Sequence, residues 1–506
     1  MSRPRPDLPG RDPRAVHHPA VPGTYRVLHP RSVIVVGGGI AGVAAATVLA
    51  ERGVSVTLLE ANDSLGGRVA AWAGEGGRTM SRGFHAFFRQ YYNLRALLKR
   101  IDPELSLLVG IKDYPLQRPD GLRDSFTNLP TTPPWSVVEF VRQSPSFSLR
   151  SLARVNVTAA LELLRVHFPG TYDDYDGESA AAFLDRLRFP DAARDLALEV
   201  FARSFFADPE NFSAGELVAM FHTYFLGSAE GLLFDVPRDD YRTTLWDPFV
   251  VFLEQLGVDV RLGVAATGLQ VGAGGARVAL AGDLPAAADA VVLATDPRVA
   301  RELIADLPAE PRTAAWKNQV AATTNAPPFI VVRLWFGGPV RADRPAFLGT
   351  SGYGPLDNVS VLERFEAGAT AWATEHHGSV VELHAYACDP VVIDDPDAAQ
   401  QVVDELEDEL HRVFAETATL PVLAREVLVR DDCTLVEPAR WADRPGVRTP
   451  DERLVLAGDW VRTAYPVALM ERAATTGILA ANALLEPWGA AGEDLWTVPM
   501  RGLLRR

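Results

Sequence analysis

Apolar runs alternate with amphipathic stretches near the N-terminus of this chain. Val33–Val36 is a run of β-branched residues, Val54–Leu59 is a second strand-like run, and the alanine-rich segment Val43–Arg52 between them predicts a helix. A strand, a helix and a second strand form a βαβ unit, whose parallel strands are buried on both faces. The pattern therefore predicts an α/β fold with a Rossmann-like sheet.

Segments with the same pattern return much later in the chain. Phe249–Leu256 predicts an amphipathic helix, and Val258–Leu262 and Ala290–Thr295 predict strands. Arg453–Trp460 predicts a further short strand, and an alanine-rich helix follows over Val467–Leu485. We therefore expect one cofactor-binding domain assembled from discontinuous segments, namely residues 31–108, 246–310 and 441–490.

Two inserts separate these segments. Residues 109–245 are mostly helical by pattern, whereas residues 311–440 alternate strands such as Phe329–Phe336 and Val380–Tyr386 with the amphipathic helix Ala398–Phe414. We expect the two inserts to form an α+β region that binds the substrate or covers it as a lid.

The composition narrows the class of protein. The 506 residues carry a formal net charge of −16, which argues against nucleic acid as a partner and against simple electrostatic binding to an anionic membrane. The two cysteines, Cys388 and Cys433, indicate neither a disulfide framework nor a cysteine-rich metal site and favour a reducing, cytoplasmic compartment. No segment of the sequence approaches the ~18 apolar residues of a membrane span, so a lipid-borne substrate would be reached from the inner membrane surface.

The two ends of the chain differ from the rest. The first 30 residues are rich in Pro, Arg and His and lack the apolar core of a secretory signal. We expect residues 1–30 to form a flexible arm and residues 491–506 a tail. His376, His377 and His384 form no ligand pattern with nearby carboxylates, so we interpret them as structural and expect no bound metal.

A glycine-rich turn, Gly37–Gly42, joins the first strand to the first helix. In the dinucleotide-binding fingerprint, Gly37 allows the tight turn, Gly39 lets the backbone approach a pyrophosphate, and Gly42 lets the helix pack on the strand. The helix start, which includes Ala41, offers free N–H groups to the phosphates. Glu60 follows 23 residues after Gly37 and is placed to accept hydrogen bonds from a ribose. The unit therefore predicts a dinucleotide site.

Two further motifs favour FAD over NAD. The loop after the second strand runs from Glu60 through Ala61 to Gly66, Gly67 and Arg68, where an NAD domain usually enters its next helix directly. Its backbone can line an extended cofactor, and Arg68 can meet a phosphate or the ring end. Near the C-terminus, Gly458 permits close backbone approach, Asp459 can bind a ribityl hydroxyl, and the following helix N-terminus can stabilise the reduced flavin.

These three motifs resemble the FAD-dependent amine oxidase and carotenoid desaturase superfamily. The resemblance spans most of the chain, with motifs at residues 33–68, 81–93, 242–268 and 453–482. Gly83–Asn93 is similar to a segment of plant-type phytoene and ζ-carotene desaturases. The resemblance implies an amine oxidase or phytoene desaturase-like fold, with FAD also contacted by the following residues: Phe84, His85, Arg242, Val264 (through its backbone) and Met470.

Within the superfamily, the pattern most resembles the enzymes that convert carotenoid β-rings into aromatic φ-rings. That resemblance implies β-carotene as the substrate and a desaturation coupled to a methyl shift, with the final electron acceptor left open. The alternatives are another carotenoid desaturase or isomerase, a flavin amine oxidase, and a carotenoid- or lipid-binding flavoprotein with structural FAD.

The acid–base candidates within this resemblance are few. His85 either takes a proton, stabilises the flavin or only packs. Glu471 either faces the cavity or favours the start of a helix.

One helical stretch combines aromatic, apolar and basic residues. It runs over Pro133–Arg142, then through Phe147, Leu149 and Leu152 toward Leu161–Arg165, and it carries these arginines: Arg142, Arg150, Arg154 and Arg165. It forms either a monotopic membrane face or a helical lid packed on the core.

Overall fold

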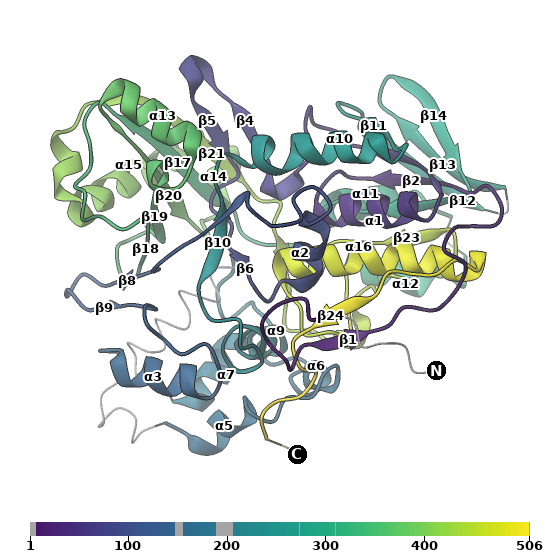
Figure 1. Ribbon diagram of the computed structural model, residues 1–506, viewed down its shortest axis with the longest axis horizontal. Coiled ribbons are helices and arrows are strands. Elements are labelled where there is room, and N and C mark those ends of the chain that lie inside the picture. Colours follow the sequence, from purple (N-terminus) through teal and green to yellow (C-terminus); the bar gives the residue numbers. More distant parts are fainter. Residues whose placement is uncertain (1–6, 147–154, 189–205, 273, 309, 505–506) are drawn as a thin grey trace.

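A computed structural model describes residues 7–146, 155–188, 206–272, 274–308 and 310–504 (Figure 1). At its centre lies a five-stranded parallel sheet in the order β11-β3-β2-β15-β23. The strands span Asp259–Arg261 (β11), Ser55–Leu59 (β3), Ser32–Val36 (β2), Ala290–Leu293 (β15) and Leu454–Leu456 (β23). Strands from three distant parts of the chain thus form one sheet.

Alternation along β2 explains how the two faces of this sheet are covered. Val33 and Val35 join the core with the helices α1 (Ile40–Glu51) and α16 (Leu469–Leu485), which run side by side in Figure 1. Ile34 and Val36 point to the opposite face and join a second core. That core includes the antiparallel strands β12 (Ala266–Gly272), β13 (Gly275–Leu280) and β14 (Asp283–Ala288) and the helices α11 (Pro297–Ala305) and α12 (Ala314–Ala321).

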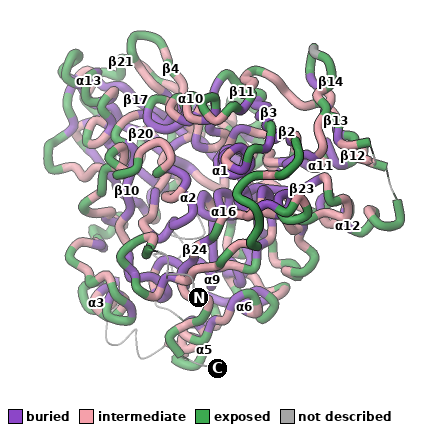
Figure 2. Tube along the Cα trace, turned by 45° about the vertical axis from the view of Figure 1, so that its right-hand side comes forward, coloured by how far each residue is buried: buried purple, intermediate pink, exposed green. Residues whose placement is uncertain are grey.

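The helices α1 and α16 approach closely at Gly477 of α16, which has no side chain. A Cβ atom on Gly477 would lie 2.3 Å from the carbonyl oxygen of Ala41. Figure 2 shows both helices as buried tubes at the centre of the molecule. The helix that follows the glycine-rich turn is therefore held from both sides, by the sheet and by α16.

A second, seven-stranded sheet lies beside the first domain, in the order β21-β17-β20-β19-β18-β8-β9. Its strands span Val422–Arg430 (β21), Phe329–Phe336 (β17), Ser379–Ala385 (β20), Asn358–Val361 (β19), Phe347–Thr350 (β18), Leu116–Gln117 (β8) and Arg123–Asp124 (β9). Alternate residues of β17 and β20 pack against α15 (Pro396–Val413). Part of the other face is covered by α13 (Ala367–His376), and the rest turns toward the first domain.

A helical region occupies the lower part of Figure 1. Its helices are α3 (Trp135–Gln143), α5 (Val157–Glu162), α6 (Gly170–Asp174), α7 (Ala180–Leu187) and α9 (Ala214–Phe221). The remaining elements are α2 (Tyr92–Leu98), α10 (Asp247–Gln255), α14 (Val391–Asp394), β4 (Ala71–Ala73), β5 (Thr79–Ser81), β6 (Phe87–Phe88), β7 (Leu108–Gly110), β10 (Phe234–Pro237), β16 (Thr324–Asn325) and β22 (Thr434–Leu435). Among the described helices, none is both long and apolar enough to cross a bilayer.

The expectation of a flexible N-terminal arm is wrong for residues 7–30. Strand β1 (Val16–His18) pairs antiparallel with β24 (Leu495–Thr497). Before it, the buried Asp12 carboxylate accepts a hydrogen bond from the Ala229 backbone N–H at 2.7 Å. Composition misled the prediction because the partners of this segment lie far away in the sequence.

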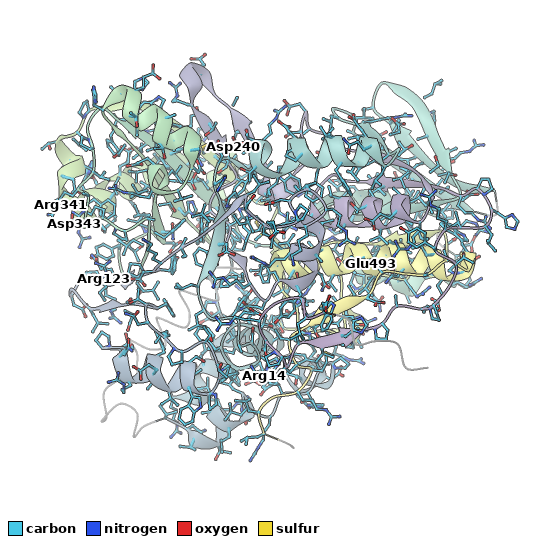
Figure 3. All side chains as sticks on the ribbon, viewed as in Figure 1. Arg14, Arg123, Asp240, Arg341, Asp343 and Glu493 are labelled. Carbon is cyan, nitrogen blue, oxygen red and sulfur yellow. The ribbon has the colours of Figure 1, made fainter. Side chains whose placement is uncertain are left out.

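Ion pairs attach the C-terminal segment to the rest of the protein. Glu493, labelled beside α16 in Figure 3, accepts hydrogen bonds from Arg52 at 2.9 Å and from Arg100 at 2.6 Å. The described parts of both terminal segments, from residue 7 and up to residue 504, therefore contact the packed body of the protein.

Candidate functional site

A cavity of about 580 Å³ lies between the parallel sheet and the seven-stranded sheet. One part of its wall comes from the glycine-rich turn, the end of β3 and the loop after it. Another part comes from β17, β20 and the aromatic residues of the inserts. The predicted site residues on this wall are Gly37, Gly39, Ala41, Glu60, Ala61, Gly67, Arg68, Phe84, His85, Val264, Gly458, Asp459 and Met470. Three predicted site residues are absent from the wall, namely Gly42, Arg242 and Glu471.

The glycine-rich turn is backbone-lined and open toward the cavity. Gly37 has a φ of +106°, a conformation that glycine adopts without strain. A Cβ on Gly39 would have only the Cα of Gly67 within 4 Å, at 3.9 Å, so the two glycine backbones face each other across open space. Gly39 caps α1 without a side-chain hydrogen bond, which leaves the first N–H groups of the helix available. This cradle fits a pyrophosphate.

Gly42 lies behind this turn. A Cβ at this position would stand 1.9 Å from the carbonyl oxygen of Gly37, so a larger residue cannot fit. The contact belongs to the packing of α1 on the turn. Its absence from the cavity wall agrees with the packing role that the fingerprint gives to the third glycine.

Glu60 links the turn to the following loop. Its carboxylate accepts hydrogen bonds from the Gly38 backbone N–H at 2.8 Å and from the Asn62 backbone N–H at 2.9 Å. Its backbone carbonyl accepts the N–H of Val264 at 2.8 Å. Glu60 is buried and holds the ends of three segments at the cavity wall.

Arg68 and Asp459, which come from opposite ends of the chain, pair directly. The Arg68 guanidinium lies 2.5 Å from the Asp459 carboxylate, and the Thr434 hydroxyl donates to the same oxygen at 3.0 Å. Burial pushes the pKa of Asp459 upward, but the neighbouring Arg68 outweighs it and holds this pKa below its usual range. Asp459 is therefore a carboxylate on the cavity wall, able to accept hydrogen bonds.

His85 is held in one tautomer. Its Nδ1 lies 2.9 Å from the carbonyl oxygen of Gly83, which can only accept, so Nδ1 carries the proton. Burial lowers the pKa of His85 to about 4, and the ring is therefore neutral at neutral pH. The Tyr241 hydroxyl fixes the loop by accepting the His85 backbone N–H and donating to the Gly83 carbonyl, both at 3.0 Å. The Nε2 atom of His85 thus bears a lone pair beside the cavity.

Glu471 is turned away from the cavity. Met470 and Ala473 line the wall, whereas the Glu471 carboxylate accepts hydrogen bonds from the backbone N–H groups of Asn93 and Leu94, both at 2.9 Å. These donors belong to the start of α2. Glu471 therefore serves a helix terminus of a neighbouring element, and the structure does not bring it to the reacting centre.

Arg242 also lies outside the cavity. Its guanidinium is 3.6 Å from Asp63 and 3.4 Å from Asp247, and about a third of the side chain (35 %) is exposed. Its place in a one-turn π-helix, residues Arg242–Trp246, points it toward the surface loop rather than the glycine turn. The structure does not support the expected contact with the cofactor.

The part of the wall opposite the glycine-rich turn is aromatic, with rings from the inserts and from the segment Gly83–Asn93. Its rings are Phe84, Phe88, Tyr91, Tyr114, Phe126, Phe206, Tyr224, Phe225, Phe234, Phe329 and Tyr386. Many touch one another; the Phe84 ring centroid, for example, lies 4.7 Å from that of Phe347 and 5.2 Å from that of Phe234. Phe84, Phe88 and Tyr91 lie in the segment Gly83–Asn93 that sequence analysis singled out. The other rings escaped it because they are single positions on many elements, with no common spacing.

A polar chain on β20 was also missed. Glu382, His384 and Tyr386 stand at alternate positions of the predicted strand, which is the signal that places them on one face. His384 and Tyr386 line the cavity. In the described parts of the chain, no cluster of histidine, cysteine and carboxylate side chains suits a metal ion.

A parallel sheet with an open glycine turn, set against an aromatic cavity, defines the class of FAD-dependent oxidoreductases. The chain belongs to the flavin containing amine oxidoreductase family, whose sequence profile matches residues 40–485. A pyridine nucleotide-disulphide oxidoreductase profile matches residues 2–75. The predicted fold class, the FAD cofactor and the oxidoreductase activity are thereby confirmed.

Individual relatives extend this result. The chain is 53 % identical to the carotenoid phi-ring synthase of Streptomyces griseus, over 98 % of this chain and 96 % of that protein. It is 28 % identical to the carotenoid phi-ring synthase of Chlorobaculum tepidum, over 94 % and 91 % of the two chains. The fold is also similar to that of cyclohexylamine oxidase from Brevibacterium oxydans, with a TM-score of 0.66, 16 % identity and coverage of 91 % and 99 %.

Proposed function

We propose that this protein is an FAD-dependent carotenoid φ-ring synthase, which converts the β-rings of β-carotene into aromatic φ-rings by desaturation coupled to a methyl shift. The observation that carries the proposal is the 53 % identity, over nearly the full length of both chains, with a protein of that name. The aromatic cavity supports it, because ring faces suit an extended apolar polyene.

The proposed FAD site follows the order of the motifs. Gly37, Gly39 and Ala41 would hold the pyrophosphate at the uncapped start of α1. Glu60, with Ala61 and Val264 beside it, would hold the ribose and adenine. The flavin end would meet the remaining wall residues of the prediction: Gly67, Arg68, Phe84, His85, Gly458, Asp459 and Met470. When bound, FAD would accept one hydride at a time, and an external electron acceptor would reoxidise it between the two hydride losses of each ring.

The chemistry requires more than hydride removal. Turning a β-ring into an aromatic ring removes two hydrides and two protons and moves one methyl group to the neighbouring carbon. The ring passes through cationic states, and the faces of Phe84, Tyr114 and neighbouring rings can stabilise such a charge in a water-poor cavity. Because a carbocation is a strong acid, a neutral imidazole with the low pKa of His85 is a sufficient proton acceptor.

Production of this protein in a β-carotene-forming host tests the proposal, with the pigments analysed by mass and absorption. We expect an aromatic φ-ring product. Unchanged β-carotene would contradict the proposal, acyclic products would favour a simple desaturase, and a χ-ring product would correct the methyl destination. Hydrogen peroxide formation with amines would indicate an amine oxidase. Flavin that keeps its oxidised spectrum on anaerobic substrate addition would indicate a binding protein with structural FAD.

We also propose that α3 contacts the inner membrane surface, where a carotenoid substrate would reside. Trp135 and Val138 lie three positions apart on α3 and are 65 % and 54 % exposed. Figure 2 shows mostly exposed and intermediate positions along this helix. Arg142 on the same helix pairs with Glu139, and Arg165 lies farther along the chain. Phe147, Leu149, Arg150, Leu152 and Arg154 of the predicted membrane face lie outside the described residues.

Vesicle sedimentation tests this contact. Because the net charge is −16, we expect binding to phosphatidylcholine vesicles that is insensitive to salt and falls several-fold in a double variant, Trp135→Ser with Val138→Ser. Val251→Ser is the matched control, since Val251 is similarly exposed (52 %) on α10. Equal binding by the double variant and the control would contradict the proposal.

A further inference from the structure

Strand β20 and Tyr386, the residue directly after it, carry a chain of hydrogen bonds that ends at the cavity wall. The Glu382 carboxylate lies 2.8 Å from Nε2 of His384, and Nδ1 of the same imidazole lies 2.6 Å from the Tyr386 hydroxyl. The three residues share one face of the chain because they occupy alternate positions. Val381, Leu383 and Ala385, which intervene, pack on the opposite side against α15.

The direction of these hydrogen bonds is fixed from the buried end. Arg333 on β17 is only 1 % exposed and donates from Nε and Nη2 to the same Glu382 oxygen, at 2.9 and 2.5 Å. Burial alone would raise the pKa of Glu382, but Arg333 and His384 outweigh it and lower this pKa to about 2. Glu382 is therefore a carboxylate that can only accept. Because this carboxylate only accepts, Nε2 of His384 carries a proton toward Glu382, and in the singly protonated imidazole Nδ1 accepts from the Tyr386 hydroxyl.

The cavity end of the chain is rigidly placed. The Tyr386 backbone N–H donates to the Asp357 carboxylate at 2.6 Å, and the Tyr386 ring packs edge-on against Phe206, with 4.8 Å between centroids. His384 also borders the His85 loop, because a Cβ on Gly83 would lie 3.3 Å from its Nε2 atom. Tyr386 therefore stands on the same wall as the residues proposed to meet the flavin and the substrate ring.

We propose that Tyr386 accepts a proton from the substrate ring, and that His384 and Glu382 are positioning residues that make its oxygen basic. The inference rests on the proposed function. In this step a C–H bond beside the ring cation breaks, and its electron pair becomes a ring C=C bond. The proton bonds to the Tyr386 oxygen while the original hydroxyl proton moves to Nδ1 of His384. The resulting imidazolium is stabilised by Glu382.

The relay explains why a neutral tyrosine can serve here. Burial raises the pKa of Tyr386 well above its usual value, so the phenol does not ionise by itself. Transfer to His384 in the same step avoids a free phenolate. A φ-ring requires two proton losses per ring, so a relay at Tyr386 is compatible with a second acceptor at His85.

The test compares Tyr386→Phe, His384→Asn and Glu382→Gln in the FAD-loaded full-length protein. The readouts are bound flavin, the maximal rate of oxidised carotenoid formation and the half-saturating substrate concentration. We expect each variant to keep its FAD and its half-saturating concentration, and Tyr386→Phe to lose 100-fold or more in maximal rate. Tyr353→Phe is the matched control, because its hydroxyl bonds to Gln117 and Arg118 of the same region outside the cavity.

Two results would overturn the relay. One is Tyr386→Phe or His384→Asn retaining more than a third of the wild-type rate. The other is a rate loss that is accompanied by loss of FAD or of the folded state in both variants, since that would assign them a structural role. The rates are scored on whichever oxidised carotenoid the wild type forms, so failure of the relay is distinguishable from failure of the φ-ring assignment.

Discussion

The two ends of the cavity are built by different means. The glycine-turn end is made of backbone, since Gly37, Gly39 and Gly67 contribute no side chains and the start of α1 contributes N–H groups. The aromatic end is made almost wholly of side chains, from the segment Gly83–Asn93, such as Phe84, and from the inserts, such as Phe234 and Tyr386. A phosphate-binding backbone needs a fixed local sequence, whereas an apolar wall needs only bulk at the right places in space. Cofactor binding and substrate choice can therefore change independently.

The largest effect should come from filling the backbone end. In Gly39→Val the new side chain would project into the open space facing Gly67, where we place the pyrophosphate. We expect loss of bound FAD and of all activity, measured as flavin absorbance per protein after purification. Gly272→Val is a matched control because no atom lies within 4 Å of a Cβ there. Stoichiometric flavin in Gly39→Val would refute the placement.

The aromatic end should respond in the opposite way. Phe234 is buried, and its ring contacts Phe84, Phe88, Tyr114 and Phe347. We expect Phe234→Ala to lower the free energy of unfolding by about 3–5 kcal/mol while the folded protein keeps its FAD. Denaturant titration with flavin absorbance checks both. Loss of flavin at full folding would show that the two ends are not independent.

His85 lies between the two ends of the cavity. Its burial predicts that the free energy of unfolding depends on pH. The imidazole pKa is about 4 in the folded protein against 6.5 for the ordinary group, so the unfolded chain takes up a proton first as the pH falls. The contribution of His85 to the free energy of unfolding is therefore full above about pH 6.5 and falls by about 3 kcal/mol toward pH 4. In His85→Gln this loss should shrink by that amount, as measured by denaturant titration across the range. The exposed His29→Gln should leave it unchanged; an equal slope in His85→Gln and wild type would contradict the assignment.

The smallest effect should come from Arg242. Because its partners are the surface carboxylates Asp63 and Asp247, we expect Arg242→Ala to keep full flavin and to change stability by no more than about 0.5 kcal/mol. Flavin content and thermal unfolding check this. A marked loss of FAD would restore the contact that the family resemblance implied.

This contrast also explains what the sequence could predict. Helix α1, the sheet strands and the bounds of β17 follow from local periodicity, and the glycine turn follows from backbone geometry, so these were accessible. The motif-based residues Gly39, Arg68 and Asp459 do line one cavity. Glu471 and Arg242 do not line the cavity. Glu471 is one position after Met470 on a helix and therefore points in another direction, and the π-helix that begins at Arg242 turns that side chain away.

Contacts between segments that are far apart in the sequence were the features that sequence analysis could not predict. The β1–β24 pairing depends on a segment at the other end of the chain, which the composition of residues 1–30 cannot reveal. The residues of the proposed relay were within reach, since Glu382, His384 and Tyr386 alternate with apolar residues in the predicted strand Val380–Tyr386. Burying a polar side chain at every second position of a strand costs folding free energy unless each one has a hydrogen-bond partner. Such a pattern therefore indicates a hydrogen-bond network or a function.

The packing of α1 against α16 has a consequence for how the protein folds during its synthesis. From Ile40 to Ala50 every residue of α1 is buried, yet α16 is synthesised more than 400 residues later. The face of α1 that meets α16 therefore stays uncovered through almost the whole of translation, which invites aggregation or chaperone capture. Premature termination before Leu469 should accordingly yield an insoluble product rather than a smaller folded domain.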